Sequence, residues 1–239
     1  MAAAADPQPG ATGSGGSVWS RLGDLLVAEF NVPIGFLSAG VGATYVDQWL
    51  PGGYYSRIQD ALNEVSANGV RAILWHQGES DTYHFGRTTY TPSATYASHL
   101  TTIINQSRMD SGRDIPWGVA IAALQPGSGY PTPEGTEAVL AVNDGQRMVI
   151  NSVSNVFQGP YTDQWGNEYR SDGAHFNAAG FDLHAAGWRD AIVKCYASRL
   201  FPYDLNGDGT LGIEDLYIFA ENYMNCTNPS DSRCPSYSP

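Results

Sequence analysis

The sequence is poor in cysteine and in basic residues, and it has no long apolar run. Three cysteines in 239 residues allow at most one intramolecular disulfide. No apolar stretch approaches 18 residues, so we expect no membrane-spanning helix. Only 12 basic residues accompany 24 acidic ones, and the net charge of -12 argues against nucleic acid or an anionic membrane as a partner. What remains is a chain of 42% hydrophobic content that can bury one core and carry a small appendage.

The cysteines bear on the compartment in which the protein works. Cys226 and Cys234 lie close together in a polar stretch near the end of the chain. They would close a small disulfide loop in an extracellular protein or remain two free thiols, and spacing alone leaves both readings open. Cys195 lies in an apolar pattern of helical spacing, which predicts a buried thiol. We expect a secreted or cell-surface protein, although the alanines after Met1 lack the basic flank and length of a signal peptide.

Helical and strand-like apolar patterns alternate along the main part of the chain. They predict helices over 18–30, 54–68, 93–109, 134–150 and 177–200. They predict strands over 33–37, 72–74, 117–124 and 153–157. Ser93 is the predicted N-cap of the third helix. Strands that alternate with helices favour an α/β fold, in which a parallel sheet lies between two layers of helices.

Two polar segments lie in the predicted loops. Trp75–Asp81 follows the strand over 72–74, at the end where a parallel sheet usually presents its ligand site. Ser171–Phe176 contains an Asp-x-x-His tetrad just ahead of the last predicted helix. One turn of chain lets the carboxylate of Asp172 reach a ring nitrogen of His175, which fixes the tautomer of the ring and raises its basicity. The pair indicates hydrolase chemistry.

These segments resemble those of the SGNH/GDSL-like hydrolases, in the branch that contains the sialate O-acetylesterases and the acetylxylan esterases of carbohydrate esterase family 6. The likeness runs from about Gly15 to Trp188. It is carried by Gly15–Trp19, Val41–Thr44 with Gln48–Trp49, Trp75–Asp81 and Asp172–Phe176. The resemblance implies a three-layer, flavodoxin-like parallel sheet and a serine ester hydrolase.

The resemblance also implies roles for five residues. His175 would be the general base, which takes the serine proton and returns it to the leaving alcohol. Asp172 would orient its ring, but some carbohydrate esterases of this type use a glutamate of the Gln-Gly-Glu block, here Glu79, and the sequence leaves that choice open. The main-chain N–H of Gly42 and the side-chain amide of Gln77 would stabilise the oxyanion. Each residue also has a plainer reading, as a turn or a solvated surface residue.

The nucleophile that the resemblance requires has no counterpart in the sequence. In the family it lies in a Gly-x-Ser block directly after the first strand, whereas this chain opens with Met1, four alanines and Asp6–Gly10. Ser14 and Ser17 are the nearest early serines, but no apolar strand precedes them to hold a hydroxyl near His175. We therefore expect an N-terminally incomplete domain without its first strand. Because that strand is internal in a flavodoxin-like sheet, we expect the chain to be poorly stable or inactive.

The segment Asp204–Asp215 matches the 12-residue calcium loop of EF-hand proteins. Oxygen ligands fall at the expected positions, and Gly209 allows the sharp turn. The predicted ligands are Asp204, Asn206, Asp208, Thr210 and Asp215. Position 12 is Asp215, and an aspartate there resembles the loop of a dockerin repeat, which implies a cohesin-like scaffold partner. Only one such repeat is visible. The plainer reading of the segment is a solvated acidic turn. The sequence thus predicts an esterase domain over 1–200 and a calcium-binding tail over 201–239.

Two functions from different classes remain open. The first is a carbohydrate O-acetylesterase, which removes acetyl groups from polysaccharide or sialic acid and needs no cofactor for catalysis. The second is a non-catalytic carbohydrate-binding or scaffold-attached module. A lipid esterase of the wider group is a third, weakly disfavoured by the lack of long apolar runs. Four residues would either wall a sugar site or belong to the core, namely Trp49, Trp75, His76 and Trp165. Three histidines have no partner spacing and carry no predicted role, namely His84, His99 and His184.

Overall fold

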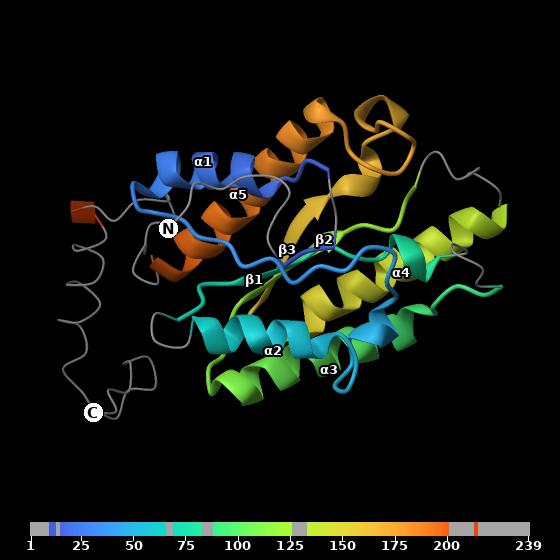
Figure 1. The fold of residues 1–239 in the computed structure, drawn as a ribbon, viewed down its shortest axis with the longest axis horizontal. Coiled ribbons are helices and arrows are strands. Elements are labelled where there is room, and N and C mark those ends of the chain that lie inside the picture. Colours follow the sequence, from blue (N-terminus) through green and yellow to red (C-terminus); the bar gives the residue numbers. More distant parts are fainter. Residues whose placement is uncertain are drawn as a thin grey trace. The chain divides into compact units, whose positions relative to one another are not determined.

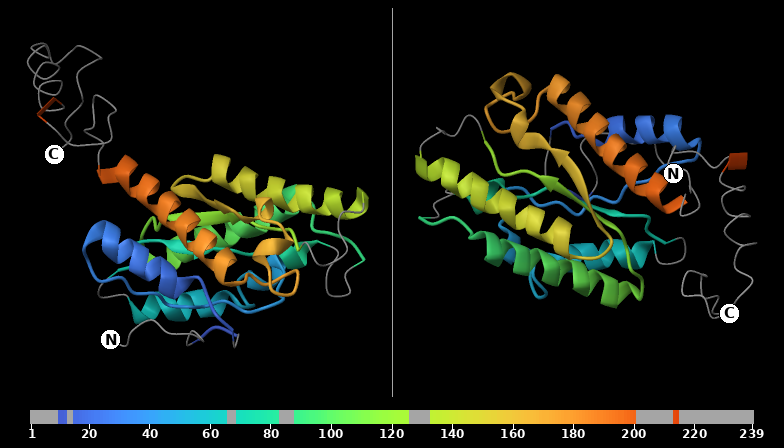
Figure 2. Two further views of the ribbon diagram at one scale, coloured as in Figure 1. Left: turned by 90° about the horizontal axis from the view of Figure 1, so that it is seen from above. Right: turned by 180° about the vertical axis from the view of Figure 1, so that it is seen from behind.

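The computed structural model describes residues 10–12, 15–65, 69–82, 88–125, 133–200 and 213–214. Within them, three parallel strands form one sheet in the order β1-β2-β3. The strands are β1 (Ile73–Trp75), β2 (Trp117–Ile121) and β3 (Val156–Tyr161). The helices are α1 (Trp19–Phe30), α2 (Tyr55–Glu64), α3 (Ser93–Ser111), α4 (Pro133–Ser152) and α5 (Ala178–Leu200). Figures 1 and 2 show α1 and α5 on one face of the sheet and α2, α3 and α4 on the other, which confirms the predicted α/β class.

Strand β2 lies at the centre of the sheet, and all five of its residues are buried. A strand covered on both faces has to be apolar throughout, which is why 117–124 carries no polar alternation. On one face, the indole of Trp188 from α5 packs where only glycine leaves room. A Cβ added to Gly118 would lie 2.8 Å from that ring, and one added to Gly159 would lie 2.6 Å from it, both too close for van der Waals contact. Trp188 is completely buried and attaches α5 to the sheet.

The other face of the sheet is covered by a cluster of large side chains. Helix α3 contributes Tyr96, Leu100, Ile103 and Ile104, each with no exposed surface. Their spacing along the chain places them on one side of the helix. Burying side chains of this size contributes about 1.5–3 kcal/mol each, which makes this layer the main source of stability around β1 and β2.

The helices end within a few residues of the predicted positions, but the predicted N-cap of α3 differs from the structure. Ser93 is the first residue of α3, and Pro92 holds the N-cap position in an extended conformation without a side-chain hydrogen bond. The predicted capping role of Ser93 is therefore wrong. Asn177 does cap α5, because its side-chain oxygen accepts a hydrogen bond from the amide of Gly180 at 3.0 Å.

The predicted strand over 33–37 is not formed, and the last strand begins later than predicted. Residues 33–37 carry no strand hydrogen bonds. A strand exists only beside a paired neighbour, and in the part of the chain that the structure describes none lies beside 33–37 or on the outer edge of β1. At the other edge, α4 extends to Ser152 and Asn155 adopts a left-handed turn with φ 57°, so β3 starts at Val156 rather than at Val153.

The chain divides into two compact units, residues 1–192 and 193–239. The second is described only at 193–200 and 213–214. The five predicted calcium ligands therefore lie outside the described residues, as do Cys226 and Cys234. Cys195 is buried, as predicted. Among the described helices, none combines the length and the apolar character needed to cross a membrane.

Candidate active site

Asp172 and His175 lie in a tight loop that precedes α5. The loop is closed at its base by an antiparallel bridge between Arg170 and Phe176 and by a hydrogen bond from the amide of Ser171 to the carbonyl of His175 at 2.8 Å. Inside it, one carboxylate oxygen of Asp172 lies 2.7 Å from Nδ1 of His175. The predicted contact between these two side chains is therefore present in the structure.

Local backbone geometry fixes the carboxylate of Asp172. Its second oxygen accepts hydrogen bonds from the amides of Ala174 at 2.9 Å and His175 at 2.7 Å. Gly173 supplies the left-handed conformation, φ 84°, that turns these amides toward the carboxylate. The hydrogen bond from the ring of His175, followed by those from the two amides, holds the pKa of Asp172 well below its ordinary value. The carboxylate therefore stays ionised and holds the proton of the ring on Nδ1.

The remaining ring nitrogen of His175 points into solvent. The side chain is 82% exposed, and in the described part of the chain no hydroxyl is hydrogen-bonded to Nε2. Of the two early serines, Ser14 lies outside the described residues, and the hydroxyl of Ser17 lies 3.3 Å from the amide of Trp19. The loop therefore presents a basic nitrogen with its tautomer set, the arrangement needed to accept a proton from an incoming hydroxyl.

Glu79, the competing acid, contacts a different imidazole. Its carboxylate lies 3.0 Å from Nε2 of His76, within the loop that follows β1. Burial opposes ionisation of Glu79, but the charge of His76, the hydrogen bond to it and the charge of Arg170 together lower the pKa from 4.5 to about 2. The structure thus contains two acid–imidazole pairs, and Asp172 is the acid that contacts His175.

Gln77 lies in a buried network rather than at an open surface. Its side-chain nitrogen donates to the carbonyl of Thr44 at 2.9 Å and to the carboxylate of Asp81 at 2.6 Å. Its side-chain oxygen accepts from the hydroxyl of Tyr96 at 3.0 Å. Both amide hydrogens are therefore engaged, and they join the loop after β1 to the turn at 42–46.

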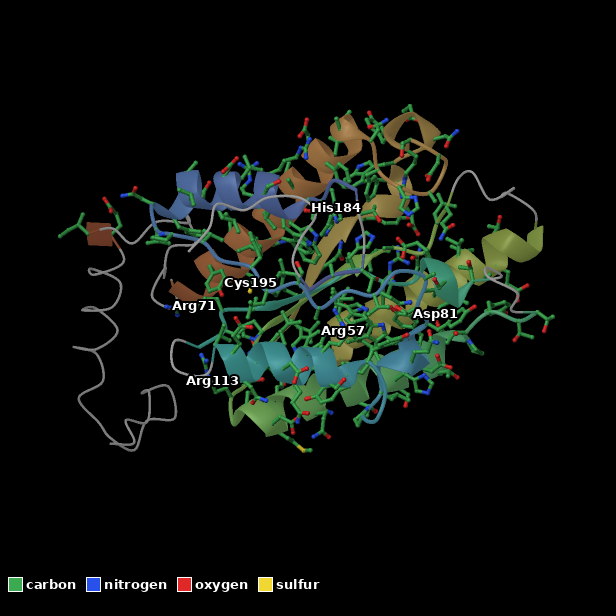
Figure 3. All side chains as sticks on the ribbon, viewed as in Figure 1. Arg57, Arg71, Asp81, Arg113, His184 and Cys195 are labelled. Carbon is green, nitrogen blue, oxygen red and sulfur yellow. The ribbon has the colours of Figure 1, made fainter. Side chains whose placement is uncertain are left out.

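Asp81, which is labelled in Figure 3, is the centre of this network. It has no exposed surface. Besides Gln77, it accepts hydrogen bonds from the amide of Val46 at 2.9 Å and from the hydroxyl of Thr91 at 2.6 Å. Sequence reasoning missed Asp81, because an acid at the end of a Gln-Gly-Glu block reads as solvated. Three donors converging from separate segments are visible only in the fold.

Gly42, the second predicted oxyanion donor, lies at the exposed edge of the same turn. Its amide donates to the side-chain oxygen of Thr12 at 2.9 Å, and the amide of Thr12 donates to the carbonyl of Gly40 at 3.1 Å. The segment at residues 10–12 therefore runs beside the turn, and a hydroxyl oxygen occupies the position on Gly42 where an oxyanion would bind.

The aromatic residues of the predicted sugar wall separate into two groups. Trp49 and Trp75 belong to the buried core cluster, with their rings 5.5 Å apart. His76 and Trp165 are half-buried around His184 of α5, their rings 4.7 and 6.1 Å from its ring. Burial lowers the pKa of His184 well below its ordinary value, and its Nε2 accepts a hydrogen bond from Trp188 at 3.0 Å.

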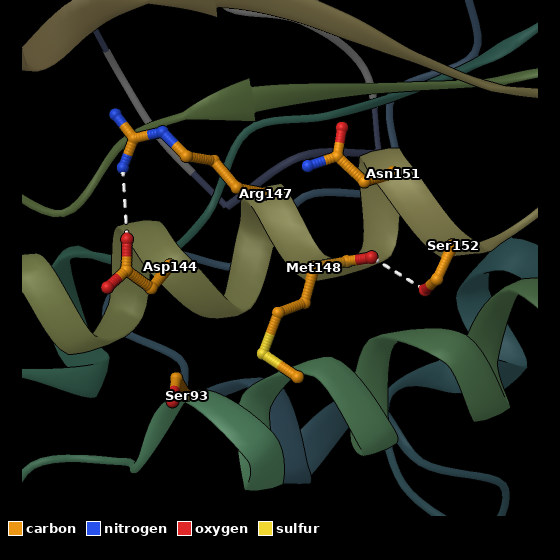
Figure 4. Close-up of a pocket in the computed structure, with 6 residues that line it drawn as sticks. All are labelled: Ser93, Asp144, Arg147, Met148, Asn151 and Ser152. Atoms are coloured by element: carbon orange, nitrogen blue, oxygen red, sulfur yellow. Dashed lines mark hydrogen bonds and ion pairs between the residues drawn. The ribbon is translucent and has the colours of Figure 1, made fainter.

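A shallow groove lies apart from these loops, along α4 and the start of α3 (Figure 4). It is lined by Ser93, Asp144, Arg147, Met148, Asn151 and Ser152. None of these residues belongs to the Asp172–His175 loop or to the Gln77 network, so the groove contributes nothing to the candidate site.

Comparisons with known proteins bear on the family and the fold of the chain. Residues 20–186, more than half of the chain, match the family described as carbohydrate esterase, sialic acid-specific acetylesterase. A search of curated proteins finds no match. A protein of Arabidopsis thaliana of solved structure is similar, with a TM-score of 0.59 and 19% identity over 76% of this chain and 69% of that one.

A GDSL-like lipase from Parabacteroides merdae is also similar in structure, with a TM-score of 0.57 and 16% identity over 74% of this chain and 82% of the other. At these identities, the two solved structures support the fold alone, which is the SGNH/GDSL-like α/β fold. The family match covers both polar loops of the candidate site. The chain therefore belongs to the carbohydrate esterase family of the sialic acid-specific acetylesterases.

Proposed function

We propose that the protein is a carbohydrate O-acetylesterase of the serine hydrolase type, acting on acetyl groups of polysaccharide or sialic acid. Membership in an esterase family gives the reaction class. The observation that carries the proposal is the 2.7 Å contact between Asp172 and Nδ1 of His175, which leaves Nε2 open to solvent. An acid-oriented imidazole with a free nitrogen is what deprotonates a hydroxyl at neutral pH.

In this mechanism, His175 removes the proton of a nucleophilic hydroxyl as that oxygen attacks the acetyl carbonyl. The ring becomes an imidazolium, which the ionised carboxylate of Asp172 stabilises at Nδ1. The proton then passes from Nε2 to the leaving sugar oxygen, and a water molecule repeats the sequence to release acetate. We assign the orienting role to Asp172 rather than Glu79, because the contact partner of Glu79 is His76.

The oxyanion would be stabilised by the amide of Gly42 and the side-chain amide of Gln77. Gly42 would exchange the side-chain oxygen of Thr12 for the substrate oxygen. The side-chain amide of Gln77 would donate to the substrate oxygen in place of the carbonyl of Thr44 and keep its hydrogen bond to Asp81. Each exchange replaces one hydrogen bond with a charge-assisted one, which favours the transition state.

The test supplies the nucleophile. The strand and Gly-x-Ser block of the family are fused ahead of Gly15, and acetate release from acetylated xylan and O-acetyl sialic acid is compared for the fused protein and the 239-residue chain. We expect release by the fused protein only, lost on His175→Ala. Full activity of the 239-residue chain, or cleavage of long acyl esters in preference to acetyl esters, would contradict the proposal.

We further propose that the tail binds one calcium ion and attaches the protein to a cohesin-like scaffold outside the cell. Support comes from the donor set alone. Carboxylate, amide and carbonyl oxygens at alternate positions of residues 204–215 are the hard ligands that calcium prefers. Calcium would bind the tail only and would have no part in ester hydrolysis.

A further inference from the structure

Arg170 is a buried cation at the base of the loop that carries Asp172 and His175. Only 7% of the residue is exposed, and its Nε has no hydrogen-bond partner. Burying a guanidinium without compensation is unfavourable, so the groups around Arg170 must offset the loss of hydration. No motif in the sequence marks this residue, which lies two positions ahead of Asp172.

The guanidinium of Arg170 contacts the chain on both sides of His175. Nη1 donates to the carbonyl of Ala174 at 2.6 Å, and the carbon of the guanidinium lies 3.9 Å from the centre of the Phe176 ring. The first contact is a charge-assisted hydrogen bond and the second a cation–π interaction. The neighbours of His175 in the sequence are therefore fastened to one rigid group, while the imidazole itself remains exposed.

Glu79 supplies the counter-charge. Burial lowers the pKa of Arg170, and the largest opposing effect is the negative charge of Glu79, followed by Asp163 and Asp172. Conversely, the charge of Arg170 helps to hold the pKa of Glu79 low. Glu79, which does not contact His175, thus acts electrostatically on Arg170. Arg170 in turn holds the loop that carries His175. The interaction links the loop after β1 to the loop before α5.

We propose that Arg170 is a positioning residue for the Asp172–His175 pair, with Glu79 as its electrostatic partner. The planar guanidinium fixes the carbonyl of Ala174 and the ring of Phe176, which sets the ring of His175 against the carboxylate of Asp172. This deepens the proposed function and rests on it, because the pair matters only if it works as a base. The geometric statement itself concerns the resting protein and needs no turnover.

The test measures which ring nitrogen of His175 carries the proton. The 239-residue chain is labelled with ¹⁵N, and the two ring nitrogen shifts of His175 are read at alkaline pH, where the ring is neutral. In the unaltered protein the proton lies on Nδ1. In Arg170→Met we expect the ratio of the Nδ1–H to the Nε2–H tautomer to fall about tenfold. The reason is that the loop would no longer hold Nδ1 of His175 at hydrogen-bonding distance from the carboxylate of Asp172.

Three further variants separate positioning from general damage. Arg170→Lys keeps the charge but not the planar contact, so its ratio should lie between those of the unaltered protein and Arg170→Met. Glu79→Gln should shift the ratio in the same direction as Arg170→Met. Arg189→Met is the control, because the carboxylate contact of Arg189 is with its neighbour Asp190 on the surface of α5, and it should leave the ratio unchanged.

An unchanged ratio in folded Arg170→Met would overturn the inference. If circular dichroism shows that this variant does not fold, Arg170→Lys decides, and a ratio equal to that of the unaltered protein overturns the inference equally. Since no ester is hydrolysed in this experiment, its outcome is separate from that of the acetate-release test. A protein could pass one and fail the other.

Discussion

The buried carboxylate of Asp81 should be one of the largest single contributors to stability in the loops. Three donors converge on it: the amide of Val46, the side-chain amide of Gln77 and the hydroxyl of Thr91. The change Asp81→Asn keeps the shape but replaces one acceptor oxygen with an NH₂ group. The NH₂ group then faces either the hydroxyl of Thr91 or the amides of Val46 and Gln77, so one or two donors lose their acceptor.

Each buried donor left without an acceptor costs about 1–3 kcal/mol, so we expect Asp81→Asn to reduce the free energy of unfolding by about 2–4 kcal/mol. With an m-value of about 3 kcal/mol/M, the urea midpoint would fall by about 1 M. Equilibrium unfolding in urea, followed by tryptophan fluorescence, measures this shift.

Asp110 on α3 provides a matched control for Asp81. It also accepts three side-chain hydrogen bonds, from Tyr55 at 2.7 Å, Gln59 at 3.1 Å and Gln106 at 2.7 Å, but it lies at the exposed surface. Water replaces the lost acceptor there, so Asp110→Asn should shift the midpoint far less. Equal midpoint shifts for the two variants would refute the argument that burial makes the Asp81 network costly to break.

Four further predictions follow from the structure and the sequence. In the fused protein, Asp172→Asn should lower the rate of acetate release about 10³–10⁴-fold with little change in KM, because the tautomer of the ring is lost; an unchanged rate would exclude Asp172 as the orienting acid. The pKa of Glu79 is lowered to about 2 on folding, so its stabilisation is present above pH 4.5 and is lost as the pH falls toward 2; Glu79→Gln should flatten the stability-versus-pH curve in that window, and an unchanged slope would contradict this. Gly78→Ala places a Cβ against the carbonyl of Ala122 and should cost about 2 kcal/mol in urea unfolding, whereas a neutral effect would show that the loop relaxes freely. Calorimetry should detect one calcium ion per chain and none in Asp208→Ala, and equal heats for both would place the ion elsewhere.

Much of the fold could be predicted from the sequence because the signals are local. Apolar periodicity predicted the five α-helices α1 to α5 of the described residues. The apolar run over 117–124 predicted the central strand, which ends earlier, at Ile121. The segment over 33–37 has the same local character, yet it forms no strand, because pairing depends on a neighbour that its own residues do not specify. The N-cap at Pro92 rather than Ser93 is likewise decided by the preceding loop, where Thr91 is tied to Asp81.

The candidate site divides in the same way. The contact between Asp172 and His175 spans three residues, so spacing alone was enough to predict it. The sequence left the partner of Glu79 undecided, because either His76 or His175 could supply an imidazole. Only the fold shows that His76 is the histidine that contacts Glu79. Arg170 gave no signal, since an arginine in a loop reads as a surface residue until its burial is seen.

Chemical rescue tests the central claim most directly. The side chain of His175 is 82% exposed, so in His175→Ala imidazole from solution can reach the position that the ring held. In the fused protein carrying this change, we predict that added imidazole restores part of the acetate release, in proportion to its neutral form. Acetate release that persists without His175, or that imidazole increases equally in the unaltered protein, would contradict the role of this residue as the base.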